Sequence, residues 1–218
     1  MKIGIMGAGH IGGTLTNGLT ELGHRVFVAN SRGPESLTAL AAETDAIPAR
    51  VPEIPLDKDV IILTIPLKNV PTLPKGLLDA APPDAVIIDT CNYYPKYNGR
   101  IDAIEDGMTE SQWVQLQLGR PVIKAFNSIT AAHLWSERKP VGTQGRIALP
   151  IAGDDPRQKA IVMELVNAFG FDPLDAGQLE ESWRQQPGKP CFIADLSKEA
   201  LPRALAEASP ERSPDWRA

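Results

Sequence analysis

A glycine-rich turn near the N-terminus has the spacing with the clearest chemical meaning. The chain reads GAGHIG over residues 7–12, directly after a short apolar run and at the start of a helical pattern, which is the context that a dinucleotide-binding motif requires. In such a motif the first glycine permits a tight turn, the second lets the backbone approach a pyrophosphate, and the third lets a helix pack on a strand. We expect all six residues to contact a dinucleotide: Gly7, Ala8, Gly9, His10, Ile11 and Gly12. The alternative is a glycine-rich turn without a ligand.

The end of the second apolar run indicates which dinucleotide is preferred. NAD-selective sites usually have Asp or Glu there, about 20 residues after the glycines, to hold the ribose hydroxyls. This chain has Asn30, Ser31 and Arg32 instead. A guanidinium can pair with a 2′-phosphate through charged hydrogen bonds, and a serine can add a hydroxyl donor. Ser31 and Arg32 therefore favour NADP, unless Arg32 is an ordinary surface charge.

Two later turns follow predicted strands and would lie at the same edge of a parallel sheet. The first is expected to border the ribose and nicotinamide, although a simple strand end fits the same pattern; it consists of Thr64, Ile65, Pro66 and Leu67. In the second turn Asn127 is the candidate catalytic residue, because its amide could orient a substrate carbonyl or carboxamide. Lys124 is either a proton donor or a surface charge. Ser128 is either a substrate contact or a helix cap.

The elements that must position these residues follow an alternating pattern. Apolar runs predict strands at residues 2–6, 26–29, 46–51, 59–65, 85–89 and 121–126, and helical patterns cover residues 14–22 and 37–43. Strands that alternate with helices imply parallel crossovers. We therefore predict an α/β protein with an NAD(P)-binding Rossmann fold and a mainly parallel sheet. Residues 92–119 interrupt the pattern with a long excursion, which is expected to be ordered because of its tyrosines.

The pattern changes again after residue 131. A strand is predicted at residues 146–152, a helix starting at Asp155-Pro156, a polar loop at 175–190 and a short helix at about 197–208. The predicted organisation is an NADP-binding domain over residues 1–128 and a small C-terminal α/β extension over residues 129–208. That extension would serve the substrate or a dimer contact, and residues 209–218 are expected to be a frayed tail.

Composition limits the classes of function. The chain has 218 residues, 43% hydrophobic and 22% charged, with a formal net charge of −5; these values are typical of a soluble globular protein and offer no basic field for nucleic acid. No apolar stretch approaches the roughly 20 residues that span a bilayer, and the N-terminus lacks a secretory pattern. The two cysteines form neither a disulfide framework nor a metal cluster. We expect a cytoplasmic protein without a metal or a membrane partner.

Several segments together resemble the NADPH-dependent reductases of the deazaflavin coenzyme F420. The matching pieces are GAGHIG at 7–12, GHRVFVANSR at 23–32, LTIP at 63–66, KAFNSITAAHL at 124–134, AGDD at 152–155 and FDPLDAGQLEES at 171–182. The resemblance implies that residues 8–11 bind the pyrophosphate side of NADP, and that Ser31 and Arg32 bind its 2′-phosphate. It also implies a cleft between two domains and direct hydride transfer between two flat rings. The turn after Arg32 lacks the second basic residue that this family often has, so the phosphate site would either be weaker or use a residue such as Arg50.

The resulting hypothesis is an NADP-dependent oxidoreductase that passes a hydride between NADPH and a second redox cofactor or small acceptor. Coenzyme F420 and a flavin are the candidate second substrates, and the loops at 92–97 and 182–186 would shape the acceptor site together with Asn127. One alternative is a reductase of a small imine or carbonyl compound. Another is a binding module that senses NADP without turnover. A homodimer is expected, because the C-terminal extension has little core of its own.

Overall fold

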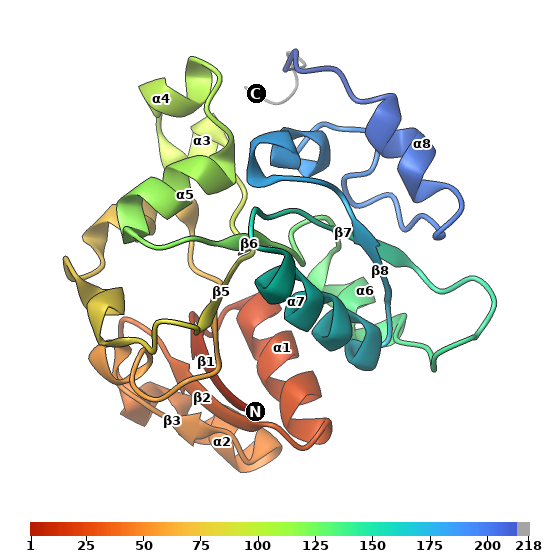
Figure 1. The fold of residues 1–218 in the computed structure, drawn as a ribbon. Helices are drawn as coiled ribbons and strands as arrows, with labels where there is room; N and C mark the ends of the chain where they lie inside the picture. The colour runs from red at the N-terminus through yellow and green to blue at the C-terminus, as the bar shows by residue number, and fades with distance from the viewer. Residues whose placement is uncertain (213–218) are drawn as a thin grey trace.

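The computed structural model describes residues 1–212 and contains a six-stranded sheet, most of whose strands are labelled in Figure 1. All its strands are parallel, in the order β3-β2-β1-β4-β5-β6. They are β1 (Lys2–Met6), β2 (Arg25–Ala29), β3 (Ile47–Pro48), β4 (Val60–Leu63), β5 (Val86–Asp89) and β6 (Ile123–Lys124). This order, with a reversal between β1 and β4, is that of the Rossmann fold, so the predicted fold class is confirmed.

The strand register brings the candidate residues to one edge of the sheet. Met6 lies opposite both Ala29 and Leu63, Leu63 lies opposite Asp89, and Asp89 lies opposite Lys124. The carboxyl ends of five strands therefore form one level row. The glycine turn and the turns after β2, β4, β5 and β6 all start from this row.

The connections differ on the two sides of the reversal. On one side the sheet is crossed by α1 (His10–Glu21), η1 (Pro34–Leu37), α2 (Thr38–Thr44) and η2 (Val51–Glu53). After β4 the chain forms only short 3-10 helices, η3 (Leu67–Thr72) and η4 (Leu77–Ala80), since Pro71 and Pro74 prevent a regular α-helix. The excursion between β5 and β6 forms α3 (Pro95–Asn98), α4 (Asp102–Glu105) and α5 (Glu110–Leu118).

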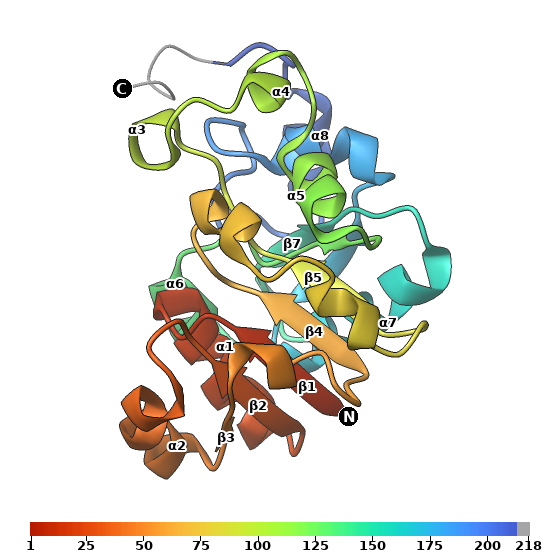
Figure 2. The ribbon, with the colours of Figure 1, turned by 90° about the vertical axis from the view of Figure 1, so that its left-hand side faces the viewer.

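The C-terminal part adds a second, two-stranded parallel sheet. Its elements are α6 (Ala131–Ser136), β7 (Ala148–Ile151), α7 (Pro156–Phe169), β8 (Asp172–Asp175), η5 (Leu179–Gln185) and α8 (Leu201–Ala206). An antiparallel bridge between Lys124 and Ala152 connects it to β6. Helices α3–α5 and α8 lie at one end of the molecule, opposite β3 and α2 (Figure 1, Figure 2).

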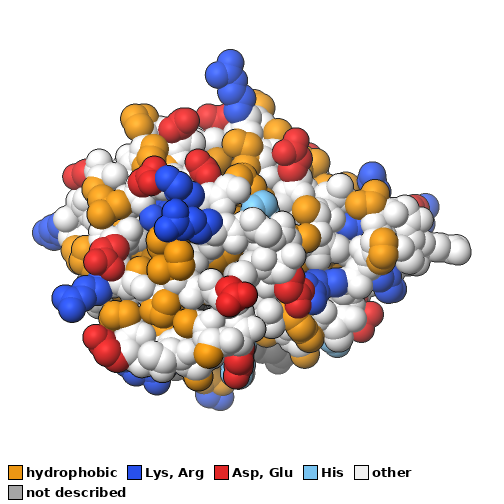
Figure 3. Space-filling model, turned by 90° about the horizontal axis from the view of Figure 1, so that it is seen from below, with side chains coloured by type: hydrophobic (Ala, Val, Ile, Leu, Met, Phe, Trp, Pro, Cys, Tyr) orange, Lys and Arg blue, Asp and Glu red, His pale blue; other side chains and the backbone are white. Residues whose placement is uncertain are grey.

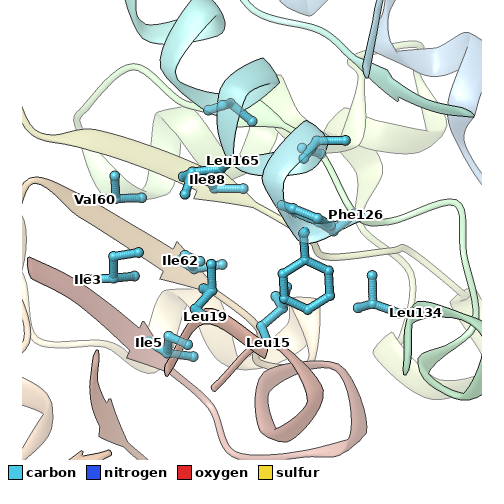
Figure 4. Packing of buried hydrophobic residues seen from close by; sticks show 14 of the residues in the cluster. Ile3, Ile5, Leu15, Leu19, Val60, Ile62, Ile88, Phe126, Leu134 and Leu165 are labelled. Atoms are coloured by element: carbon cyan, nitrogen blue, oxygen red, sulfur yellow. The ribbon is translucent and has the colours of Figure 1, made fainter. Parts of the chain in front are cut away.

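Both faces of the large sheet are covered by apolar side chains, which explains why its strands read as continuous apolar runs. On one face Leu15 and Leu19 of α1 and Leu165 of α7 pack against Ile62 and Ile88 of the sheet (Figure 4). This cluster joins residues from the predicted N-terminal domain and from the C-terminal extension. The other face packs against η3, η4 and α5.

Several boundaries differ from the sequence predictions. Helix α1 starts at His10 rather than at residue 14, and β8 was not predicted. The helix that follows Ser128 starts at Ala131, and its cap is Thr130, whose hydroxyl accepts a hydrogen bond from the backbone N–H of His133; the alternative of Ser128 as a helix cap is wrong. Asp155 caps α7 as predicted.

The predicted tail overlaps the described residues only in part. Over residues 209–212, the carbonyls of Ser209 and Glu211 accept hydrogen bonds from Lys189, and residues 213–218 lie outside the described part of the chain. Among residues 1–212 no helix has the length and apolarity to cross a membrane. Acidic and basic side chains are interspersed over the face seen in Figure 3.

Candidate dinucleotide-binding site

A pocket of about 330 Å³ lies at the carboxyl edge of β1, β2 and β4, where open parallel sheets bind their ligands. The strand order reverses between β1 and β4, so the pocket is at the switch point of the fold. Its lining consists of Met6, Gly7, Ala8, Gly9, Ala29, Asn30, Ser31, Arg32, Val51, Thr64, Ile65, Pro66, Asn69, Thr72 and Leu73. The glycine turn, the end of β2 and the turn after β4 thus meet around one cavity, as the sequence predicts.

The glycine turn is fixed in place by close backbone contacts. Gly7 has a φ of +113°, and a Cβ there would lie 2.6 Å from the carbonyl oxygen of Thr64. A Cβ on Gly12 would lie 2.0 Å from the carbonyl oxygen of Gly7. The Thr64 hydroxyl donates a 2.8 Å hydrogen bond to that same carbonyl. Gly7 and Gly12 are therefore required by the turn itself, and Thr64 holds the turn against β4.

Gly9 is different, because its missing side chain leaves open space. A Cβ on Gly9 would have no atom within 4 Å. Gly9 is also the residue that precedes α1, and no side chain caps that helix end. The first N–H groups of a helix have no partner within the helix, and together with the helix dipole they attract anions. The structure thus presents an uncapped helix start beside an unfilled space, which fits a pyrophosphate.

The turn after β2 presents a cation at the rim of the pocket. Asn30 accepts a hydrogen bond from the backbone N–H of Arg32 and is itself bonded to the Ser36 hydroxyl. Ser31 and Arg32 are exposed and line the pocket. Within residues 1–212 the Arg32 guanidinium forms no salt bridge. It is therefore available to an anionic ligand, whereas Arg50 is exposed and outside the pocket lining.

Not every residue predicted for the cofactor lines the pocket. The predicted residues that line it are Gly7, Ala8, Gly9, Ser31, Arg32, Thr64, Ile65 and Pro66. His10 is exposed at the first position of α1, Ile11 packs partly on the core, and Leu67 is fully buried in the core. That these three residues contact a cofactor stays a prediction. The same holds for Gly12, which could contact a cofactor only through its backbone.

Other lining residues were missed by the sequence reasoning. Val51 and Leu73 supply apolar walls, while Asn69 and Thr72 supply polar groups from η3. A short 3-10 helix has no periodic apolar pattern, so its inward-facing side could not be identified from the sequence. The signal in the sequence that could have indicated these residues is the proline-rich stretch directly after the expected cofactor-binding turn at residues 64–67.

Asn127 lies outside the pocket lining and is 3% exposed. Its amide nitrogen donates to the side-chain oxygen of Asn92 and to the Gln185 carbonyl, and its amide oxygen accepts from the Gln185 side chain. Phe126, just before it, has a φ of +59°, a conformation that is strained for a bulky side chain and that tends to occur at functional sites. The loops at 92–97 and 182–186 therefore meet at Asn127, whose catalytic role stays a prediction.

A buried ion pair lies between β5 and β6, at the same edge of the sheet. Lys124 is completely buried, so the interpretation of this residue as a surface charge is wrong. Its ammonium lies 3.3 Å from Oδ2 of Asp89 and also donates to the Cys91 carbonyl. Asp89 additionally accepts hydrogen bonds from the Ser111 hydroxyl and the Cys91 backbone N–H. The acidic partner is the last residue of the predicted strand 85–89, and it meets Lys124 because β5 and β6 pair in that register.

Cys91 is not suited to nucleophilic chemistry. Its thiol is buried and donates a hydrogen bond to the Ile65 carbonyl. Burial raises the pKa of the Cys91 thiol well above its usual value, and the negative charge of Asp89 adds to the effect. Since the thiolate is the reactive form, this environment disfavours nucleophilic chemistry at Cys91.

Comparison with known proteins finds a family similarity in the N-terminal part of the chain. Residues 2–93 match the family model described as NADP oxidoreductase coenzyme F420-dependent. The protein YjhV of Escherichia coli (strain K12) is 45% identical over 68 residues, which are 31% of this chain and 50% of that protein. The chain thus matches half the length of this curated relative. The segments at 124–134, 152–155 and 171–182 that resemble the family lie beyond the matched residues.

Solved structures extend the likeness to nearly the whole fold. The hypothetical protein SMa0349 from Sinorhizobium meliloti is 28% identical, with a TM-score of 0.76 over 91% of this chain and 96% of that one. A candidate F420-dependent NADP-reductase from Arthrobacter sp. FB24 is 20% identical, with a TM-score of 0.67 over 84% and 87%; at this identity the likeness shows the fold alone. Residues 2–93 therefore match the model of the coenzyme F420-dependent NADP oxidoreductases, and the six-stranded sheet has the strand order of a Rossmann fold.

Proposed function

We propose that this protein binds NADP(H) in the pocket at the switch point and passes a hydride between it and a second acceptor. The observation that supports this most strongly is the arrangement of the pocket. An uncapped helix start lies beside the unfilled space over Gly9, and the Arg32 guanidinium lies at the rim. The first feature suits a pyrophosphate, and the guanidinium, which forms no salt bridge within residues 1–212, suits an additional phosphate on the adenine ribose.

The fit to the cofactor can be followed along the pocket. Ser31 and Arg32 would hold the 2′-phosphate, and the apolar side chains of Val51 and Leu73 would enclose the adenine. The helix start would bind the pyrophosphate. Ile65 and Pro66, at the end of β4, would then direct the nicotinamide towards the ends of β5 and β6.

The nicotinamide supplies the hydride when it is bound, so the protein has to hold an acceptor against it. Asn92, Asn127 and Gln185 form a hydrogen-bonded amide group beside the ends of β5 and β6. We propose that this group fixes the carbonyl or ring edge of the acceptor. Positioning of two flat reactants in this way accounts for a large part of the rate in hydride transfer.

The nature of the acceptor is tested by a panel that contains coenzyme F420, a flavin, and a small cyclic imine and ketone. NADPH oxidation is followed at its absorbance band with each compound, after NADPH binding has been measured by calorimetry. Oxidation with F420 or flavin supports a cofactor reductase, and oxidation with the imine or ketone alone supports a small-molecule reductase. Tight NADPH binding without oxidation by any acceptor would contradict hydride transfer and leave a sensing role. Absence of NADPH binding would contradict the whole proposal.

A further inference from the structure

The members of the amide group differ in the donors that they have left for a ligand. The Asn127 amide nitrogen uses both of its hydrogens, one to the Asn92 side-chain oxygen at 3.1 Å and one to the Gln185 carbonyl at 2.8 Å. The Gln185 amide nitrogen also has two partners, the Asn127 side-chain oxygen at 2.9 Å and the Pro150 carbonyl at 3.4 Å. A primary amide has two N–H donors. These two buried residues therefore have no donor left for an acceptor molecule.

Asn92 does have a donor left. Within residues 1–212 its amide nitrogen makes one hydrogen bond, to the Asn127 carbonyl at 2.9 Å. Its side chain is partly exposed, whereas Asn127 and Gln185 are buried. The second amide hydrogen of Asn92 can therefore reach a ligand at the surface of the amide group.

The partners of the two asparagines also fix the orientation of their amides. A backbone carbonyl can only accept a hydrogen bond, so the side that faces it must carry the NH₂ group. Asn92 faces the carbonyl of Asn127, and Asn127 faces the carbonyl of Gln185. Rotation of either amide by 180° would place two oxygens against each other. The unused hydrogen on Asn92 is thus a consequence of the network.

The backbone next to Asn92 contacts the wall of the dinucleotide pocket. The Cys91 thiol donates a hydrogen bond to the Ile65 carbonyl at 3.2 Å, and Ile65 lines the pocket. Asn92 is the next residue, and consecutive Cα atoms are about 3.8 Å apart. Asn92 therefore lies beside the end of β4, where the nicotinamide is proposed to point.

Buried charged groups hold this backbone in place. Asp89 accepts a hydrogen bond from the Cys91 N–H, and Lys124 donates to the Cys91 carbonyl. Glu110 is also completely buried, and its Oε2 lies 3.9 Å from the same ammonium. Asn92 thus extends from a fixed point of the chain, as a group that orients a reactant requires.

We propose that Asn92 donates its second amide hydrogen to a carbonyl oxygen of the acceptor, and that Asn127 acts through Asn92 by holding its side chain. This inference depends on the proposed hydride transfer. The reduction breaks a C–H bond of NADPH and forms one at an acceptor carbon conjugated with that carbonyl, so negative charge develops on the oxygen. Solvent then supplies one proton for each NADPH oxidised. A donor at this oxygen stabilises the developing charge. Asn92 is then a catalytic residue and Asn127 a positioning residue.

The first test measures single-turnover reduction of 5-deazariboflavin by NADPH with the full-length protein. We expect Asn92→Ala to lower the rate about 100-fold, the lower end for loss of one such donor, without a change in NADPH affinity by calorimetry. Asn92→Asp should be equally slow, because it keeps the shape of the side chain but has no hydrogen to donate. Asn17→Ala is the matched control, since Asn17 is a partly exposed residue of α1 outside the pocket lining.

Two results of this test would overturn the inference. One is a normal rate in both Asn92 variants. The other is a loss of NADPH affinity that matches the loss of rate, which would place Asn92 on the nicotinamide instead of the acceptor.

The second test is a double-mutant cycle with Asn127→Ala. The single variant should lower the rate by up to about 100-fold, because a misplaced donor loses its effect. The double variant Asn92→Ala/Asn127→Ala should be no slower than Asn92→Ala alone, since Asn127 acts through Asn92. Independent contacts of the two residues with the acceptor would multiply the two losses, and that result would contradict the positioning role.

A third measurement needs no turnover. Infrared difference spectra are recorded for oxidised 5-deazariboflavin bound to the complex with NADP⁺. A carbonyl band should lie at lower frequency in the wild type than in Asn92→Ala, because a hydrogen bond weakens the C=O bond, and identical bands would overturn the inference. So would a wild type that oxidises NADPH with another acceptor but neither binds nor reduces 5-deazariboflavin. Failure of the wild type to bind NADPH would contradict the proposed function instead.

Discussion

Replacement of Arg32 by alanine tests the 2′-phosphate site of the pocket independently of the pyrophosphate site. The guanidinium is exposed at the rim and forms no salt bridge within the described residues, so its removal should leave the fold and the pyrophosphate site unchanged. A hydrogen bond to a charged group contributes about 1.5–3 kcal/mol, and exposure to solvent places this one near the lower end. We expect the NADP⁺ dissociation constant to rise about 10- to 30-fold, which corresponds to about 1.5–2 kcal/mol.

The assay is isothermal titration calorimetry with NADP⁺ and NAD⁺ on the wild type and on Arg32→Ala. NAD⁺ has no 2′-phosphate, so its affinity should change less than about 3-fold, the range of a weak surface charge effect. Arg25→Ala is the matched control, because Arg25 is also exposed but lies at the opposite end of β2. The difference between the two nucleotides should shrink in about 1 M salt, where the Debye length is about 3 Å. Equal losses for NADP⁺ and NAD⁺ would refute the assignment of the 2′-phosphate to Arg32.

Three further predictions follow from the packing and the buried charges. Gly12→Ala should lower the free energy of unfolding by about 3 kcal/mol in urea titrations because its Cβ would collide with backbone, whereas Gly9→Ala should keep the unfolding midpoint and weaken NADP⁺ binding. Lys124→Met should destabilise the protein by about 3–5 kcal/mol, since it leaves Asp89 buried without its cation; an unchanged urea midpoint would contradict this. The native state binds the Glu110 proton more tightly than the unfolded chain, because its pKa is about 7 in the fold. Its contribution to the free energy of unfolding, up to about 3 kcal/mol, should therefore be present below about pH 4.5, decline as the pH rises, and be lost above about pH 7. Urea titrations at several pH values measure this free energy. The same pH dependence in the wild type and in Glu110→Gln would contradict the prediction.

The N-terminal half of the fold was predictable because its signals are local. The run of residues 2–6 gives β1 as predicted, and the glycine spacing requires a turn directly after it. Buried strands such as β4 and β5 read as unbroken apolar runs, since both of their faces are covered. Because these strands alternate with helices along the chain, a parallel sheet is the favoured arrangement.

Other features depend on contacts between distant segments, which the sequence does not display. The inward position of Lys124 requires Asp89 from β5 and the start of α5 to close over it. Strand β8 has the sequence DPLD, whose proline and acidic residues are poor strand formers, and it exists because it pairs with β7. Thr130 rather than Ser128 caps α6, because the helix begins at Ala131 and the Thr130 hydroxyl accepts a hydrogen bond from the backbone N–H of His133.

The candidate site was predictable to a similar extent. The motif identified Gly7, Ala8 and Gly9, and the position after β2 identified Ser31 and Arg32; these five residues line the pocket. The walls formed by Val51 and Leu73 were not predicted, because they come from short 3-10 segments without a periodic pattern. Glu110 was not predicted either, since burial of a charged residue depends on the tertiary fold.

A crystal structure with bound NADP⁺ tests the central claim most directly. The account predicts density for the pyrophosphate against the backbone N–H groups that follow Gly9, and a 2′-phosphate within hydrogen-bond distance of the Arg32 guanidinium and the Ser31 hydroxyl. It also predicts that the nicotinamide points towards the ends of β5 and β6. A nucleotide bound elsewhere, or one whose 2′-phosphate lies away from Arg32, would contradict the account.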